Sequence, residues 1–168
     1  MKPDHFIIAL MLLTALPMTI FGSENLQFSG TLIVPPVCTV SDQGGRINVH
    51  FKQNISTKRI DGEQYRQTVG YRIDCTAGSF VPGTWRMHLT VRAIGADFDK
   101  NAIQTSVADL GIKLILGGSN LLINQPREIS IDSPTNVPVL EAVPVKRAGA
   151  ELPSIEFTAS ALLIAEVY

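Results

Sequence analysis

The sequence predicts an all-β protein, an antiparallel β-sandwich of immunoglobulin type. Apolar and polar residues alternate with a period of two along most of the chain, as in half-buried strands. Glycines and prolines divide these stretches into about seven short strands, a number typical of immunoglobulin-like sandwiches. With 168 residues, the chain is long enough for one domain with a real core. No stretch carries a sustained helical stripe.

Residues 1–22 are expected to be a secretory signal peptide. Lys2 lies in a short charged start, and the apolar run from Phe6 to Phe21 is too short to span a bilayer comfortably. The mature chain is therefore expected to begin near Ser23. The alternative is a retained membrane anchor, which N-terminal sequencing would reveal.

Cys38 and Cys75 are the only two cysteines of the chain. In an oxidising compartment an even pair is more often a disulfide than two free thiols. Closing a loop of this length would stabilise the fold by about 3 to 4 kcal/mol in the chain-entropy model. Two cysteines without adjacent histidines supply too few ligands for a metal site, so neither a metal nor a cofactor is expected.

The mature chain is predicted to begin with a strand-forming arm, residues 23–34, followed by the domain, residues 35–168. Leu26, Phe28, Gly30 and Leu32 share one face of the arm. A glycine in the middle of an apolar strand face is unfavourable unless another group must approach closely there. The arm is therefore expected to pack against a partner whose binding surface is shallow where it meets Gly30.

Further strands are expected along the rest of the chain. The alternation over 46–51, 64–75 and 84–94 predicts three strands, of which the third is the most regular. Residues 108–116 and 121–124 flank the turn signal Gly117-Gly118-Ser119-Asn120 and predict a hairpin. The segment 136–145 contains two prolines and suits an edge or interrupted strand, and 99–110 is compatible with a short turn of helix.

The last predicted strand runs from about Ile155 to Val167 and is apolar on both faces. One face holds Phe157, Ala159, Ala161, Leu163, Ala165 and Val167. A strand apolar on both faces is expected to be covered on both. Because Tyr168 is the last residue, no later strand of the chain would pair with it, and a bare apolar edge is an aggregation hazard. The alternative is that another strand of the same chain closes the sandwich.

Several kinds of function are disfavoured. A net charge of -1 with scattered Lys and Arg does not suggest nucleic-acid binding. After the signal only His50 and His88 remain, too few for a histidine metal site. There is no nucleophile elbow and no paired-carboxylate signature. We therefore expect no catalytic residues, no small-molecule substrate and no enzyme activity.

Taken in order, these segments resemble the pilin subunits of chaperone-usher fimbriae, especially the short tip or adaptor subunits of P-type pili. The matching pieces are "LQFSGTLIVPPVCTV", "YRIDC", "LGIKL" and the terminal "FTASALLIAEVY". The resemblance implies an incomplete immunoglobulin-like fold that lacks its final strand. It implies a structural subunit of a bacterial surface fimbrium, contributing to pilus biogenesis and cell adhesion.

The same resemblance implies the partners. A periplasmic chaperone would lend a strand beside the final strand and anchor Tyr168, and at the outer-membrane usher the arm of the next subunit would replace it. The arm Leu26 to Leu32 would fill the groove of the preceding subunit. Two residues depart from the family pattern: Val167 stands where an aromatic residue is usual, and Ile155 replaces a glycine.

The competing interpretation is a self-contained secreted β-sandwich that binds a carbohydrate or a protein. Trp85 could line such a ligand site, but it lies on the apolar face of its predicted strand, which favours a place in the core.

Overall fold

The structure is a computed structural model in which the chain divides into two compact units, Met1–Leu32 and Ile33–Tyr168. The described residues are 26–32, 34, 36–42, 45–51, 54–76, 86–130 and 136–168. The predicted signal peptide, residues 1–22, lies outside them, as does Trp85.

In the first unit, residues 26–32 have no regular secondary structure. Their apolar side chains are exposed, with Leu26 67%, Phe28 86% and Leu32 101% accessible. A strand is stable only when its backbone groups have partners. The arm therefore has the alternating sequence of a strand, but it does not form a strand in the isolated subunit.

The second unit is all-β apart from one 3-10 turn, η1 (Thr57–Arg59), among the residues described. Its strands are β1 (Cys38–Ser41), β2 (Gln67–Val69), β3 (Arg72–Cys75), β4 (Met87–Arg92), β5 (Ile103–Gln104), β6 (Leu110–Leu116), β7 (Ser119–Leu121), β8 (Arg127–Ile129), β9 (Leu140–Lys146) and β10 (Leu162–Val167). Every pairing between them is antiparallel. The predicted fold class is confirmed.

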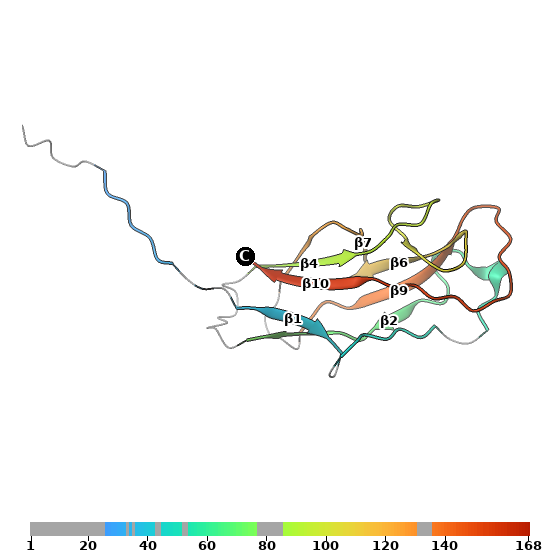
Figure 1. The fold of residues 1–168 in the computed structure, drawn as a ribbon, viewed down its shortest axis with the longest axis horizontal. Helices are drawn as coiled ribbons and strands as arrows, with labels where there is room; N and C mark the ends of the chain where they lie inside the picture. The colour runs from blue at the N-terminus through green and yellow to red at the C-terminus, as the bar shows by residue number, and fades with distance from the viewer. Residues whose placement is uncertain are drawn as a thin grey trace, which may run out of the picture. The chain divides into compact units, whose positions relative to one another are not determined.

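The strands form two main sheets and one small ribbon. One sheet has the order β10-β4-β8, the other has the order β2-β9-β6-β5 with β7 added on β6, and β1 pairs with β3. Figure 1 shows β10 beside β4 in the first sheet, and β9 with β6 in the second. Within the first sheet β10 has β4 on one side only, so its other side is an edge.

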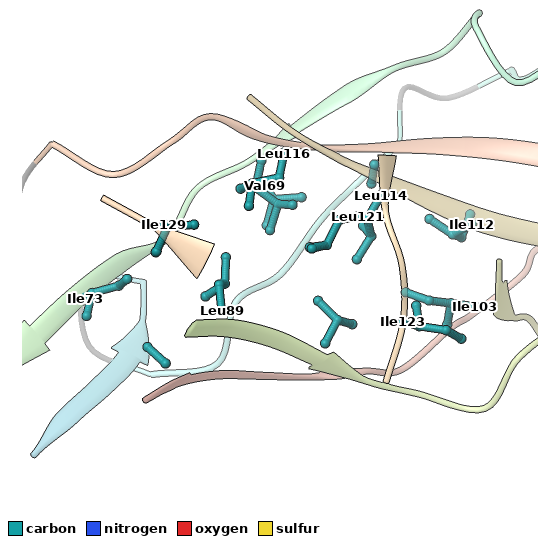
Figure 2. Packing of buried hydrophobic residues seen from close by; sticks show 14 of the residues in the cluster. Val69, Ile73, Leu89, Ile103, Ile112, Leu114, Leu116, Leu121, Ile123 and Ile129 are labelled. Carbon is teal, nitrogen blue, oxygen red and sulfur yellow. The ribbon is translucent and has the colours of Figure 1, made fainter. Parts of the chain in front are cut away.

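The larger of two hydrophobic clusters lies between the sheets. Met87, Leu89 and Val91 of β4 are buried on its inner face, and Ile112 and Leu114 of β6 belong to the same cluster from the other sheet. Figure 2 shows these layers meeting, with Leu89 and Ile129 opposite the side chains of β6. Each fully buried aliphatic side chain contributes about 1.5 to 3 kcal/mol relative to its exposed state.

The stretch 64–75, predicted as one strand, passes from the sheet of β9 to the small ribbon formed with β1. β2 pairs with β9, and after a break at Gly70 and Tyr71, β3 pairs with β1. The Tyr71 hydroxyl donates a hydrogen bond to the Pro138 carbonyl at 2.7 Å, and burial raises the pKa of this phenol to about 12. At the end of β3, Cys75 is the register partner of Cys38, and the two form the expected disulfide.

The hairpin predicted in the second half of the chain is also present. β6 pairs with β7 through the turn at Gly117 and Gly118, whose φ angles are +56° and +80°. Positive φ at two successive residues is the geometry that favours glycine in tight hairpins.

Segment 136–145 was expected to suit an edge or interrupted strand better than a central one, and that expectation is wrong, because β9 runs without interruption from Leu140 to Lys146. β9 lies inside its sheet, between β2 and β6. The pairing with β2 ends at Ala142, whereas the pairing with β6 continues through Pro144 to Lys146. Among the described residues, Pro144 therefore has a paired strand on one side only. A residue without a backbone N–H is tolerated at such a position.

Three smaller expectations are also corrected. No helix forms within 99–110, which instead contains β5 and two turns, because Ile103 pairs with Ile112. The last strand is shorter than predicted, since β10 begins at Leu162 and only an isolated bridge at Ala159 precedes it. Residues 46–51 form no ladder, and they lie at the site described next.

Candidate functional site

An apolar groove of about 1350 Å³ opens on the second unit. It runs between two chain segments, residues 45–51, which we name the first rim, and residues 152–163, which we name the second rim. Its floor is formed by core side chains from both sheets, namely Val69, Val91, Ile103, Ile112, Leu114, Leu140 and Ala142. The groove therefore reaches the hydrophobic core itself.

The first rim has the side-chain pattern of a strand without a neighbour. Ile47, Val49 and Phe51 pack against the core, while Asn48 and His50 are exposed. No backbone–backbone hydrogen bond involves residues 45–51 in the described part of the chain. The Gly45 N–H donates to the Asp42 carboxylate at 3.1 Å, and the Arg46 carbonyl accepts from the Asn48 side chain at 3.2 Å. The other backbone donors and acceptors of the first rim have no partner within the described residues and are available to a strand from another molecule.

The second rim is attached on one side only. The Ser106 N–H donates to the Thr158 carbonyl at 2.8 Å, and the Thr158 N–H donates to the Ser106 hydroxyl at 3.0 Å. Backbone groups of successive residues in an extended chain point to opposite sides. Those of Phe157, Ala159 and Ala161 therefore point away from Ser106, toward the groove.

An aromatic contact crosses the groove from rim to rim. The ring centroids of Phe51 and Phe157 are 5.8 Å apart with the planes tilted by 45°. This separation is within the range of favourable aromatic pairs, each worth about 0.5 to 1.5 kcal/mol beyond area burial. The next two residues on the same face of the second rim, Ala159 and Ala161, are small; they line the groove and are exposed.

Of the predicted edge residues, Phe157, Ala159, Ala161 and Leu163 line the groove, whereas Ala165, Val167 and Tyr168 do not. Phe157, Leu163 and Val167 pack against the core, and Ala165 is buried within it. Tyr168 lies beyond the end of β10, where its N–H donates to the Arg86 carbonyl at 3.1 Å and its ring stacks on His88 at 4.2 Å between centroids. The arm residues Leu26, Phe28, Gly30 and Leu32 belong to the other unit.

Sequence reasoning missed the first rim and the floor. The alternation of Ile47, Val49 and Phe51 indicated only a strand, because side-chain pattern does not reveal whether a backbone has partners. The floor residues belong to the hydrophobic core, and no sequence signal marked them as lining a groove. A test for an alternating segment without an available partner strand would have pointed to the site.

Charged groups with shifted pKa values lie away from the groove lining. Hydrogen bonds from the backbone amides of Gln64 and Glu63 lower the pKa of Asp61 to about 2. A hydrogen bond from Lys113, followed by one from the Asn101 amide, lowers the pKa of Asp99. Within the described residues there is no group of three or more potential metal ligands, and no helix long and apolar enough to cross a membrane.

Comparison with known proteins places these features in context. The model of the fimbrial protein family matches residues 26–167. The fimbrial-like protein YfcQ of Escherichia coli K12 is 37% identical over 142 residues, which cover 84% of this chain and 86% of the relative. A second fimbrial-like protein of that organism, YfcR, is 29% identical over 151 residues, covering 86% and 82% of the two chains.

Solved structures share the fold at lower identity. The P pilus adaptor subunit PapF superposes with a TM-score of 0.55 at 20% identity, covering 82% of this chain and 98% of PapF. The P pilus rod subunit PapA superposes with a TM-score of 0.57 at 17% identity, covering 78% of this chain and 99% of PapA. A subunit from the structure of a chaperone-usher pilus superposes with a TM-score of 0.57 at 18% identity, covering 91% of this chain and 100% of that subunit. The chain therefore belongs to the fimbrial protein family, as a non-enzymatic structural subunit of a chaperone-usher pilus on the cell surface.

Proposed function

We propose that this protein is a minor subunit of the pilus, an adaptor or tip component, that is assembled by donor-strand exchange. In this proposal a periplasmic chaperone first fills the groove with one of its strands. At the outer-membrane usher, the arm of a neighbouring subunit replaces that strand. The arm of this chain, residues 23–34, fills the groove of the preceding subunit in turn.

The observation that carries the proposal is the pair of unpaired backbone edges on either side of an apolar floor. A β-strand placed between the rims would pair with the first rim on one side and with Phe157, Ala159 and Ala161 on the other. Its inward side chains would cover the floor residues. Such addition of a strand in trans combines main-chain hydrogen bonds with side-chain pockets.

The arm has the composition that such a groove requires. Burying Leu26, Phe28 and Leu32 in a partner would contribute on the order of 5 to 9 kcal/mol before ordering costs. The same side chains are exposed in the isolated subunit. The fold is shared with the P pilus adaptor subunit PapF and equally with the rod subunit PapA, so it supports a place in a pilus, and the adaptor or tip role is the finer part of the proposal.

Co-expression with a pilus chaperone tests the proposal. We expect the mature chain to be captured by the chaperone and to co-purify with it. A lone chain that is a stable monomer, melts cooperatively and ignores the chaperone would show the proposal to be wrong and would favour a self-contained β-sandwich that binds its own ligand.

A matched pair of variants identifies the groove as the capture site. Ala161→Arg places a charge on the groove side of the second rim, whereas Ser119→Arg places the same charge on an exposed position of β7 that does not line the groove. Burying an unpaired charge is costly, so only Ala161→Arg should lose the chaperone. Equal capture of both variants would contradict the assignment.

A further inference from the structure

The unpaired edge of the second rim continues past the groove to the end of the chain. Figure 1 shows the C-terminus at the tip of β10, which pairs within its sheet with β4 only. The Tyr168 N–H donates to the Arg86 carbonyl, just ahead of β4, at 3.1 Å. Backbone groups of successive residues in an extended chain point to opposite sides. Those of Leu163, Ala165 and Val167 therefore point away from β4, along the same edge as the groove-facing residues of the second rim.

A ring contact on the outer face of the sheet holds the last residue of this edge. Met87 and Leu89 of β4 are buried toward the core, so His88 between them faces outward. The His88 ring stacks on the Tyr168 ring, with centroids 4.2 Å apart and planes inclined by 21°. His88 is the register partner of Glu166, so Tyr168 lies diagonally across from it. Aromatic side chains can bridge this diagonal spacing between strands.

The place of the aromatic ring follows from the alternation of the strand. Val167 packs against the core from the inner face of β10. The next residue, Tyr168, therefore projects to the outer face, where His88 lies. Tyr168 remains 53% exposed, and chain ends are poorly ordered unless they are tied down. The stack on His88 and the hydrogen bond to Arg86 are the ties that the structure provides.

Resting on the proposed function, we propose that His88 is a positioning residue for strand addition. By stacking on Tyr168 it keeps β10 paired with β4 to its last residue. The edge that a partner strand meets then runs without a break from the groove to the chain end, including the backbone groups of Ala165 and Val167. Without the stack the end of β10 would fray, and the edge would be shorter by these last groups.

Hydrogen exchange of the complex between the subunit and the chaperone, read by mass spectrometry, tests the positioning. In His88→Ala we expect residues 163–168 to exchange at least about threefold faster, because local opening sets the exchange rate. Residues 110–116 of β6 should exchange as in the wild type, and His88→Phe, which keeps a ring, should restore slow exchange at 163–168. Unchanged exchange at 163–168 in His88→Ala, or no rescue by His88→Phe, would overturn the proposal.

Release of the chaperone measures the consequence for the partner. We expect His88→Ala to release it about 2 to 10 times faster in exchange against labelled chaperone, the range expected for loss of one aromatic pair. Arg92→Ala is the matched control, because Arg92 lies on the same face of β4 but opposite Leu162. It should release the chaperone at the wild-type rate, and equal acceleration by Arg92→Ala would contradict the role of His88.

A double variant tests whether His88 acts through Tyr168. His88→Ala and Tyr168→Ala remove the same contact, so the double variant should release the chaperone no faster than the faster single variant. Multiplying effects would refute a shared contact. If the chaperone captures the wild type and releases His88→Ala at the same rate, the positioning role fails and the proposed function stands. If the chaperone does not capture the wild type, both proposals fail.

Discussion

Removing the disulfide should cost this domain a large part of its stability. The perturbation is the double variant Cys38→Ser with Cys75→Ser, which opens a covalent loop with a sequence separation of 37. In the chain-entropy model a loop of this length contributes about 4 kcal/mol at room temperature. Domains are typically stable by about 5 to 15 kcal/mol, so we expect a quarter or more of the unfolding free energy to be lost.

Urea unfolding of the mature chain in its complex with the chaperone, followed by circular dichroism and corrected for the chaperone alone, measures this loss. Dithiothreitol should lower the wild-type midpoint to that of the serine variant and should not change the variant. A loss below about 1 kcal/mol would refute the reasoning, because β1 would then be held by its ladder with β3 and not by loop closure. Chaperone capture should weaken in parallel, since the first rim directly follows β1.

Three further predictions concern single sites. Leu89→Ala, at a fully buried position, should lower the unfolding free energy by about 2 to 5 kcal/mol in the same urea titration. Val139→Ala, at an exposed position, should change the unfolding free energy by no more than about 0.5 kcal/mol. Gly95→Ala should destabilise by about 1 to 3 kcal/mol, because a Cβ there would lie 2.8 Å from the Lys100 carbonyl oxygen; an unchanged thermal midpoint would contradict the clash. Because the folded pKa of Tyr71 is raised to about 12 from 10.0, its stabilisation is present below pH 10 and is lost as the pH rises toward 12; Tyr71→Phe should reduce this alkaline loss in unfolding titrations.

Side-chain periodicity predicted most of the fold. The alternation around Met87, Leu89 and Val91 correctly identified a half-buried strand, and the glycine pair at 117–118 identified a hairpin. Both signals depend only on residues close together in the sequence, and the tertiary structure agrees with both of them. The position of β9 was not predicted correctly, because whether Pro144 is tolerated depends on where the neighbouring strand ends.

The candidate site was predictable only in part. The apolar residues of the last segment indicated an edge in need of a partner, and the structure places Phe157, Ala159 and Ala161 along a groove. The opposite rim could not be found in the same way. Ile47, Val49 and Phe51 alternate as any strand does, and the absence of a ladder along them is a tertiary property.

The disulfide also has a mechanical meaning for a protein that is a link in a fibre. If the arm joins this subunit to its neighbour, as we propose, tension enters the domain just ahead of Cys38, the first residue of β1. A four-residue ladder loaded from its end would open one hydrogen bond at a time. Because Cys38 is covalently joined to Cys75, the load passes instead into β3 and from there into the strand that continues through β2. The pull is therefore shared with the sheet of β9 before any bond of the β1 ladder has to break.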